Sequence, residues 1–360
     1  MAFWAVIALV VLLLLAAMVI YMVHVTGKFS FVKKLSQGKR ATRRIISTAL
    51  NVFLLAVLTF TMSFVNAVVI YIHLGLFIML FELVFKLVPK EKRESFKVYW
   101  PGILALAATV VVTLVGIYLC FNVWQTNYTL TTSKSIAPVR IALIADSHLG
   151  TTMDGEEFAS YMEEIEAQHP DMLIIAGDFI DDASPREDMV RACEALGEMD
   201  LPYGVYYAYG NHDRGYYDDG TRGAELAANL EANGVQILQD QIAYVGDIVI
   251  VGREDASWDR QEISDLLTGI DESRYIVVID HEPTDYENEA ATSADLVLSG
   301  HTHGGQLFPL TLMGKLFGND GTYGLMNING TDFIVTSGIS NWELLMKTGT
   351  RSEYVIIDIG

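Results

Sequence analysis

Cysteine is nearly absent from this sequence. Its two cysteines, Cys120 and Cys193, lie in a long apolar run and in an expected helix, so we do not expect a disulfide between them. No C-x-x-C pair is present, which argues against a zinc ribbon and a dithiol redox centre. The chain also lacks a Walker-type phosphate loop and a catalytic serine elbow. Any chemistry must therefore come from other side chains.

Basic residues are scarce in the second part of the chain. Residues 1–140 contain 14 of the 24 basic and three of the 44 acidic residues, which leaves 10 basic and 41 acidic residues for the remainder. Phosphate-backbone binding depends on Lys and Arg, so this acidic part disfavours nucleic acid as a partner. A phosphate-containing substrate is still compatible with it, because bound metals can supply the local positive field.

The first part of the chain has long hydrophobic runs. Ala2–Val23 is long enough to span a bilayer, and it lacks the basic start and short apolar core of a signal peptide. Ile45–Leu87 is too long for one helix and suggests two helices with a turn near Ser63–Asn66, and Pro101–Phe121 adds another. We expect an all-α transmembrane region at 1–121, followed by a polar linker at 122–138. Its four helices would span about 2–23, 45–63, 67–87 and 101–121.

The loops between these helices predict an orientation. His24–Arg44 and Lys90–Lys97 are rich in Lys and Arg, whereas the turn between the second and third helices carries no charge. The positive-inside rule places both basic loops in the cytoplasm. With four spans, the C-terminal part would then lie outside the cytoplasm. The prediction is a multi-pass cell-membrane protein with an extracytoplasmic domain.

From residue 139 onward, short apolar runs typical of buried strands alternate with helical patterns. The runs that matter most are Val139–Ala145, Met172–Ala176, Gly204–Ala208, Tyr275–Ile279 and Ala294–Leu298. Helical spacing of apolar and charged positions is found at Glu156–Gln168, Arg186–Met199 and Gly223–Asn233. This alternation predicts an α/β domain at 139–360.

Each of these apolar runs is followed by a polar block. The blocks are Asp146-Ser147-His148, Gly177-Asp178, Gly210-Asn211-His212-Asp213, His281 and Gly300-His301-Thr302-His303. Open α/β sheets bind ligands just past the carboxyl ends of their strands, so these side chains are expected to converge. Mixed oxygen and imidazole ligands suit divalent metals such as Mn, Fe or Zn. Two such metals can activate water and hold both oxygens of a displacement at phosphorus.

The order D-x-H, G-D, G-N-H-[DE], H and G-H-x-H resembles the calcineurin-like metallophosphoesterase superfamily. The longer run from Gly300 to Gln306, GHTHGGQ, is similar to its membrane-anchored bacterial branch. The resemblance implies a four-layer αββα sandwich and a metal-dependent phosphoric ester hydrolase. Taken singly, Asp146 or Asp178 could cap a loop and His281 could be an ordinary hydrogen-bonded histidine. Five blocks in the family's order favour the metal site.

The resemblance also implies a role for each residue. One metal would be held by Asp146, His148, Asp178 and His303. The second would share Asp178 and be completed by Asn211, His281 and His301. His212 would contact the substrate phosphate, and Asp213 would orient the His212 imidazole.

Several other residues have two possible roles. The apolar run Leu307–Phe317 could pack in the core, or it could form an apolar lip that meets a bilayer or an acyl chain. Tyr216 and Tyr217 could stack on a head group or pack within their loop. Asp181, Asp182, Asp218 and Asp219 are expected to be solvated loop charges, and the alternative for each is a place at the rim of the pocket.

Together these features predict a membrane-anchored phosphoesterase with two metals. Its substrate would be a phosphodiester, pyrophosphate or phosphomonoester, with lipid- or envelope-linked molecules favoured because four spans exceed what an anchor needs. Two alternatives stay open. One is a non-catalytic metal-binding scaffold on a membrane anchor, and the other is a phosphodiesterase for a soluble substrate such as a cyclic nucleotide.

Overall fold

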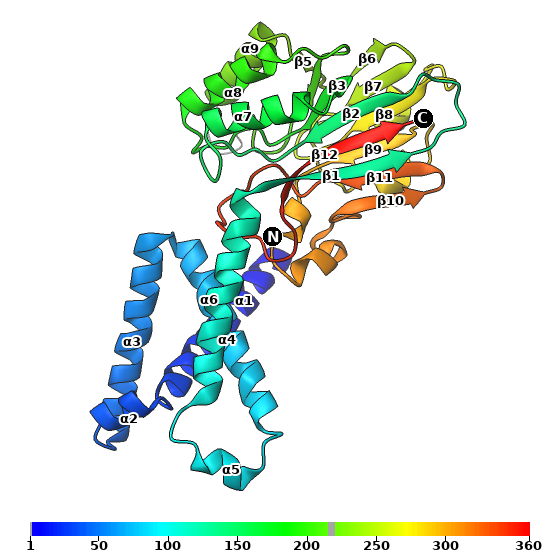
Figure 1. Cartoon of the computed structure of the whole chain (residues 1–360). Helices are drawn as coiled ribbons and strands as arrows, with labels where there is room; N and C mark the ends of the chain where they lie inside the picture. The colour runs from blue at the N-terminus through cyan, green and yellow to red at the C-terminus, as the bar shows by residue number, and fades with distance from the viewer. Residues whose placement is uncertain (1, 215–219) are drawn as a thin grey trace. The chain divides into compact units, whose positions relative to one another are not determined.

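The computed structural model describes residues 2–214 and 220–360, in two compact units, Met1–Val115 and Gly116–Gly360 (Figure 1). The first unit is helical and the second contains two β-sheets with flanking helices. Tyr216, Tyr217, Asp218 and Asp219 lie outside the described residues, so the structure does not address their predicted roles.

Helices make up the first unit. They are α1 (Ala2–Thr26), α2 (Ser30–Leu35), α3 (Arg40–Thr61), α4 (Phe64–Phe85), α5 (Lys90–Ser95) and the first part of α6 (Trp100–Phe121). Among the described residues, α3, α4 and α6 are each long and apolar enough to cross a membrane, and Leu12–Thr26 of α1 forms a shorter apolar stretch. The Ser63 hydroxyl accepts a hydrogen bond from the Asn66 N–H at 3.2 Å and so caps the start of α4.

The helical unit has a small core and an apolar exterior. Met22, Leu74 and Ile78 are buried between helices, whereas Phe60 and Leu87 are more than four-fifths exposed. A helix that is apolar on its outer face is what a lipid environment requires. The chain is therefore a membrane protein, in agreement with its hydrophobic runs.

Two six-stranded sheets form the centre of the second unit. The first has the order β1-β12-β2-β3-β4-β5, with bounds Val123–Leu130, Ser352–Ile359, Val139–Ile144, Met172–Ala176, Val205–Ala208 and Gln236–Ile237. The second has the order β10-β11-β9-β8-β7-β6, with bounds Gly324–Ile328, Thr331–Val335, Leu296–Ser299, Tyr275–Ile279, Ile248–Gly252 and Gln241–Val245. Strands β2 to β5 are parallel to one another, as are β7, β8, β9 and β11.

Alternating side chains on these strands build three layers of core. Leu143 of β2 and Val277 of β8 pack between the two sheets. The neighbouring Ile144 faces the other way and packs under α7 (Gly155–Glu166), α8 (Arg186–Glu198) and α9 (Thr221–Ala232). The outer face of the second sheet is covered by the four-residue helices α10 (Ile263–Leu266) and α11 (Tyr286–Glu289). The predicted αββα sandwich is confirmed, with a thinner second helical layer.

The segment expected to be a linker at 122–138 contains a strand. Strand β1 pairs in parallel with β12 along its whole length, from Val123 with Ser352 to Leu130 with Ile359. The polar Thr and Asn residues of β1 suit this position, because β1 is an edge strand and most of its side chains are only partly buried. Residues 123–130 therefore belong to the sandwich, and the 122–138 linker is corrected to the shorter segment after Leu130.

Candidate metal centre

Parallel strands bring the five polar blocks to one edge of the sandwich. Asp146, Asp178 and Asn211 follow β2, β3 and β4, which are neighbours in the first sheet. His281 and His301 follow β8 and β9, which are neighbours in the second sheet. Because parallel strands end at the same edge, the blocks meet as the sequence predicts.

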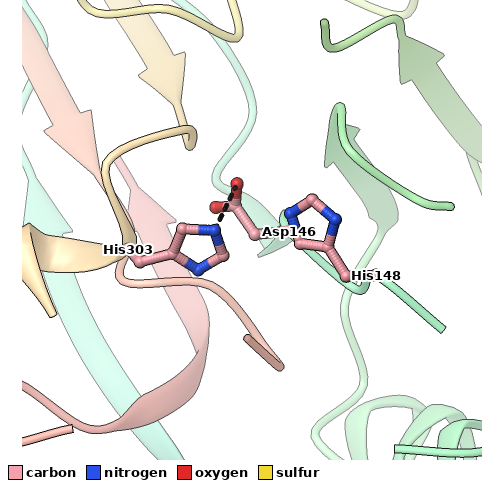
Figure 2. A group of neighbouring side chains, drawn as sticks. All are labelled: Asp146, His148 and His303. Carbon is pink, nitrogen blue, oxygen red and sulfur yellow. Dashed lines mark ion pairs between the residues drawn. The ribbon is translucent and has the colours of Figure 1, made fainter. Parts of the chain in front are cut away.

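Asp146, His148 and His303 form a first group. Their ligand atoms lie within 4.8 Å of one another, and all three residues are buried. Figure 2 shows the Asp146 carboxylate between the two imidazoles, with an ion pair marked to His303. His303 Nε2 is 3.9 Å from Asp146 Oδ1, and the rings of His148 and His303 are stacked with centroids 5.2 Å apart.

Asp178, His281 and His301 form a second group, also with ligand atoms within 4.8 Å of one another. The Asn211 Oδ1 atom lies 3.2 Å from His281 Nε2 and 3.1 Å from His301 Nδ1, so Asn211 joins this group. His281 Nδ1 is 2.7 Å from the Ala176 carbonyl, to which it can donate. That bond leaves the Nε2 lone pair, on the side of Asp178, for a metal, in the manner of a metal-binding histidine.

Asp178 connects the two groups. Its Oδ2 atom lies 3.2 Å from His281 Nε2 and 3.5 Å from His148 Nε2. One carboxylate oxygen therefore faces imidazoles of both groups. A carboxylate in this position can divide its negative charge between two cations.

Buried polar atoms of the first group have no hydrogen-bond partner among the described residues. These atoms are Asp146 Oδ2, His148 Nδ1, His148 Nε2 and His303 Nδ1. Leaving buried polar atoms unsatisfied costs about 1–3 kcal/mol each. A divalent cation would satisfy several of them at once, so the residues present fit a metal.

Burial also sets the charge state of the ligands. It raises the pKa of Asp146 to about 7 and lowers the pKa of His148 to about 3 and that of His301 to about 4. Burial alone would raise the pKa of Asp178, but His281 beside it holds that pKa well below the ordinary value. Ionised Asp178 and neutral imidazoles at His148 and His301 are the forms that bind a cation.

The backbone around the site is bent in a way that sequence spacing alone does not show. Positive φ angles occur at Asp146 (55°), His148 (35°), Asp178 (53°), His301 (67°) and His303 (48°). Such angles are uncommon for residues with a side chain and gather at functional sites.

Close packing also explains two glycines of the motif. A Cβ atom on Gly210 would lie 2.3 Å from Asp178 Oδ1, and one on Gly300 would lie 2.7 Å from Asp146 Oδ2. Both glycines are therefore required by the approach of a ligand carboxylate.

His212 lies beside the first group. Its ring is half-buried, with its centroid 5.1 Å from that of His148 and 5.3 Å from that of Trp342. Its backbone N–H donates to Asp178 Oδ1 at 3.0 Å. The imidazole is thus next to the ligands and open toward solvent, where a substrate could reach it.

Asp213 has different contacts from those the resemblance implied. Its fully buried carboxylate accepts four backbone hydrogen bonds, of 2.7 to 3.1 Å, from the N–H groups of Asp178, Phe179, Ile180 and Gly210. Among the described residues, no hydrogen bond joins it to the His212 imidazole. The expectation that Asp213 orients this ring is corrected, because its oxygens are committed to the loops after β3 and β4.

Two charged residues near the site are buried, contrary to what the sequence suggested for the first and without any sequence signal for the second. Asp181 is buried, not solvated, and its Oδ2 lies 3.8 Å from His148 Nδ1. Its place three residues after Asp178 was the available signal. Lys347 is fully buried, and its Nζ donates to the carbonyls of Ser337 and Ser340. No sequence pattern indicated this lysine.

The apolar run after the last block is exposed. We define the apolar mouth as Phe308, Leu312, Leu316 and Phe317, whose side chains are 62 to 78% exposed. The core-packing interpretation is wrong for these four residues. Phe317 also lines a cavity of about 310 Å³. The rest of its lining includes the candidate ligand His301 and both apolar and polar residues, among them Leu307, Leu310, Gln306 and Asn319. A cavity with a partly apolar wall therefore adjoins the candidate metal centre.

An αββα sandwich with carboxylate and imidazole groups at its strand ends defines a metallophosphoesterase-type domain. Residues 139–305 match the family model for calcineurin-like phosphoesterases. An uncharacterised metallophosphoesterase of Campylobacter jejuni is 30% identical over 228 residues, which cover 61% of this chain and 59% of that protein. A transmembrane protein with a metallophosphoesterase domain from Danio rerio is 30% identical over 238 residues, which cover 61% and 53%.

For a third relative, the match covers a larger share of that protein's own length. An uncharacterised metallophosphoesterase of Aquifex aeolicus is 28% identical over 245 residues, which cover 65% of this chain and 90% of that protein. By contrast, the chain spans little more than half the length of the relatives from C. jejuni and D. rerio.

Proposed function

We propose that the protein is a membrane-anchored phosphoesterase that works with two divalent metals on a lipid- or envelope-linked phosphoester. The observation that carries this proposal is the position of Asp178, whose Oδ2 lies 3.2 Å from His281 and 3.5 Å from His148. A single carboxylate shared by two ligand groups is the arrangement that a dinuclear centre needs. The family match of residues 139–305 supports the reaction class.

Each metal would be held by four side chains, one of which is shared. The first set is Asp146, His148, Asp178 and His303. The second set is Asp178, Asn211, His281 and His301. When bound, Mn, Zn or Fe in these sites would supply positive charge for the phosphate and make water acidic enough to act near neutral pH.

His212 is the residue proposed to contact the substrate. In hydrolysis the oxygen of water bonds to phosphorus and gives up a proton, the ester P–O bond breaks, and the leaving oxygen gains a proton. The half-buried His212 ring lies within 5.1 Å of His148 (centroid to centroid) and can donate that proton or hold a phosphate oxygen. The Asp178 carboxylate accepts a hydrogen bond from the backbone N–H of His212 and so holds this residue next to the candidate metal centre.

The membrane helices and the apolar mouth support a substrate with an apolar part. We propose four spans, with the basic loops at 24–44 and 90–97 in the cytoplasm and the sandwich outside. Protease added to intact cells should then cleave the sandwich. Protection of the sandwich in intact cells, with cleavage after the cells are opened, would show the reverse orientation.

The reaction is tested on the purified full-length protein in detergent. After chelation and restoration of Mn or Zn, turnover of an aryl phosphodiester and of an aryl monoester is compared. We expect Asp178→Asn to abolish metal-dependent turnover and His212→Ala to lower kcat by about 10²–10⁴ with metals retained. His169→Asn changes an exposed histidine with a left-handed backbone outside both groups, and should leave turnover unchanged. Folded, metal-loaded protein that hydrolyses neither ester, nor a phospholipid in vesicles, would contradict the proposal.

A further inference from the structure

The helical unit contains a cavity lined by basic residues. The cavity has a volume of about 360 Å³ and lies where residues 28–33, 82–86 and 93–101 meet. These segments adjoin the end of α1, the end of α4 and the start of α6, and Figure 1 shows α2 and α5 at the same end of the unit. The cations in the lining are Lys28, Lys33, Lys86, Arg93 and Lys97.

The one carboxylate in this lining is already satisfied. Glu82 accepts hydrogen bonds from Lys28 Nζ at 2.5 Å, from the Tyr99 hydroxyl at 2.5 Å and from the Tyr21 hydroxyl at 3.3 Å. Lys28 thereby neutralises Glu82. The other four cations are left without an acidic partner in the cavity.

These four cations also make no ion pair elsewhere in the described part of the chain, although Arg93 donates a hydrogen bond to the Phe85 carbonyl at 3.5 Å. Across residues 2–214 and 220–360, none of Lys33, Lys86, Arg93 and Lys97 makes an ion pair, although the nearby Lys90 pairs with Glu94. Like charges gathered around one cavity repel one another unless an anion is present. A multiply charged anion that accepts several hydrogen bonds, such as a phosphate group, would relieve this repulsion.

The surroundings of the cavity favour a lipid as the source of that phosphate. Aromatic side chains, among them Tyr99 and Trp100, line it, and such residues favour the membrane–water interface. Leu83 and Leu87 nearby are exposed and apolar, as expected where acyl chains lie against a helix. We propose that this cavity binds the phosphate-bearing headgroup of an anionic phospholipid. All its lining residues belong to the helical unit, so the site is separate from the candidate metal centre.

The test uses full-length protein in a neutral detergent, titrated with phosphatidylglycerol or phosphatidylcholine and followed by native mass spectrometry. The variant Lys86→Gln/Lys97→Gln removes two exposed cations of the cavity. The control Lys90→Gln/Lys92→Gln removes the same charge from α5, and neither residue lines the cavity. We expect tighter binding of phosphatidylglycerol, weakened roughly tenfold or more in the cavity variant and unchanged in the control.

Three results would overturn the proposal. Equal weakening in both variants would indicate general surface charge. Equal binding of phosphatidylcholine would show that no anion is selected. Displacement of the lipid by inorganic phosphate at equal concentration would identify a site for free phosphate in its place.

Discussion

At the residue scale, Asp178 and Asp213 have different roles: Asp178 faces the candidate ligands, and Asp213 holds the backbone of the loop that carries Asp178. Asp178 Oδ2 faces imidazoles of both ligand groups, while its Oδ1 accepts the His212 N–H. Asp213 lies behind it and accepts the backbone N–H of Asp178 itself at 2.8 Å. The second carboxylate thus fixes the loop that presents the first.

Asp213→Asn should destabilise the protein. An asparagine keeps one acceptor oxygen but turns an amide toward two of the four buried N–H groups. Because unsatisfied buried donors cost about 1–3 kcal/mol each, we expect a loss of at least about 2 kcal/mol in the free energy of unfolding. Thermal unfolding of the full-length protein measures it. Asp154→Asn is the matched control, since Asp154 caps α7 and asparagine caps helices equally well.

An unchanged unfolding temperature in Asp213→Asn, together with lost turnover, would contradict this account. It would show that Asp213 acts through His212, as the family resemblance implied. The same variant therefore separates a loop-fixing role from a ring-orienting role.

At the element scale, the strand ends were predictable and the edges of the sandwich were not. Strands β2, β3, β4, β8 and β9 were predicted because each is a continuous apolar run, as buried parallel strands require. Strand β1 is polar because it is an edge strand, so its composition is that of a linker. The ligands were predictable from motif order. The contacts of Asp213 with residues 178–180 were not, because they join segments more than 30 residues apart, and those of Lys347 were not, because no periodicity or motif marks a buried lysine in a loop.

The segment between β11 and β12 depends on Lys347. Its Nζ holds the carbonyls of Ser337 and Ser340, and a Cβ on the intervening Gly338 would lie 2.7 Å from the Asp146 Cβ. This buried lysine therefore supports the loop that packs behind a metal ligand.

Lys347 should make stability depend on pH. Burial lowers the pKa of Lys347 from 10.5 to about 8. Between these values the unfolded chain keeps a proton that the folded protein releases, so stability rises with pH in that window. The free energy of unfolding of wild type, relative to Lys347→Met, should increase by about 3 kcal/mol from pH 8 to pH 10.5. Parallel pH curves for the two proteins would contradict this.

At the scale of the whole molecule, charge and hydrophobicity divide the chain into an apolar, basic helical part and an acidic sandwich. Residues 1–140 are basic and apolar, whereas the remainder is strongly acidic. The sequence predicted this division because composition reports it directly. Whether Leu307–Phe317 is buried or exposed could not be predicted, because a buried segment and an exposed apolar surface can have the same amino-acid composition.

The apolar mouth should matter only for substrates with an apolar part. Leu316→Ser/Phe317→Ser removes exposed apolar surface beside the cavity that contains His301, so hydrolysis of a phospholipid should weaken. Hydrolysis of a soluble aryl ester should not change. Leu325→Ser/Met326→Ser, at exposed positions of β10, is the control and should affect neither. Equal loss on both substrates would exclude a role in substrate choice.

The most direct test of the central claim is the metal content of the purified full-length protein after loading with Mn or Zn, measured by inductively coupled plasma mass spectrometry. The account predicts two metals per chain in wild type, one in His303→Ala or His281→Ala, and a loss at both sites in Asp178→Asn. A single metal in wild type, or two metals retained by folded Asp178→Asn, would contradict a dinuclear centre bridged by Asp178.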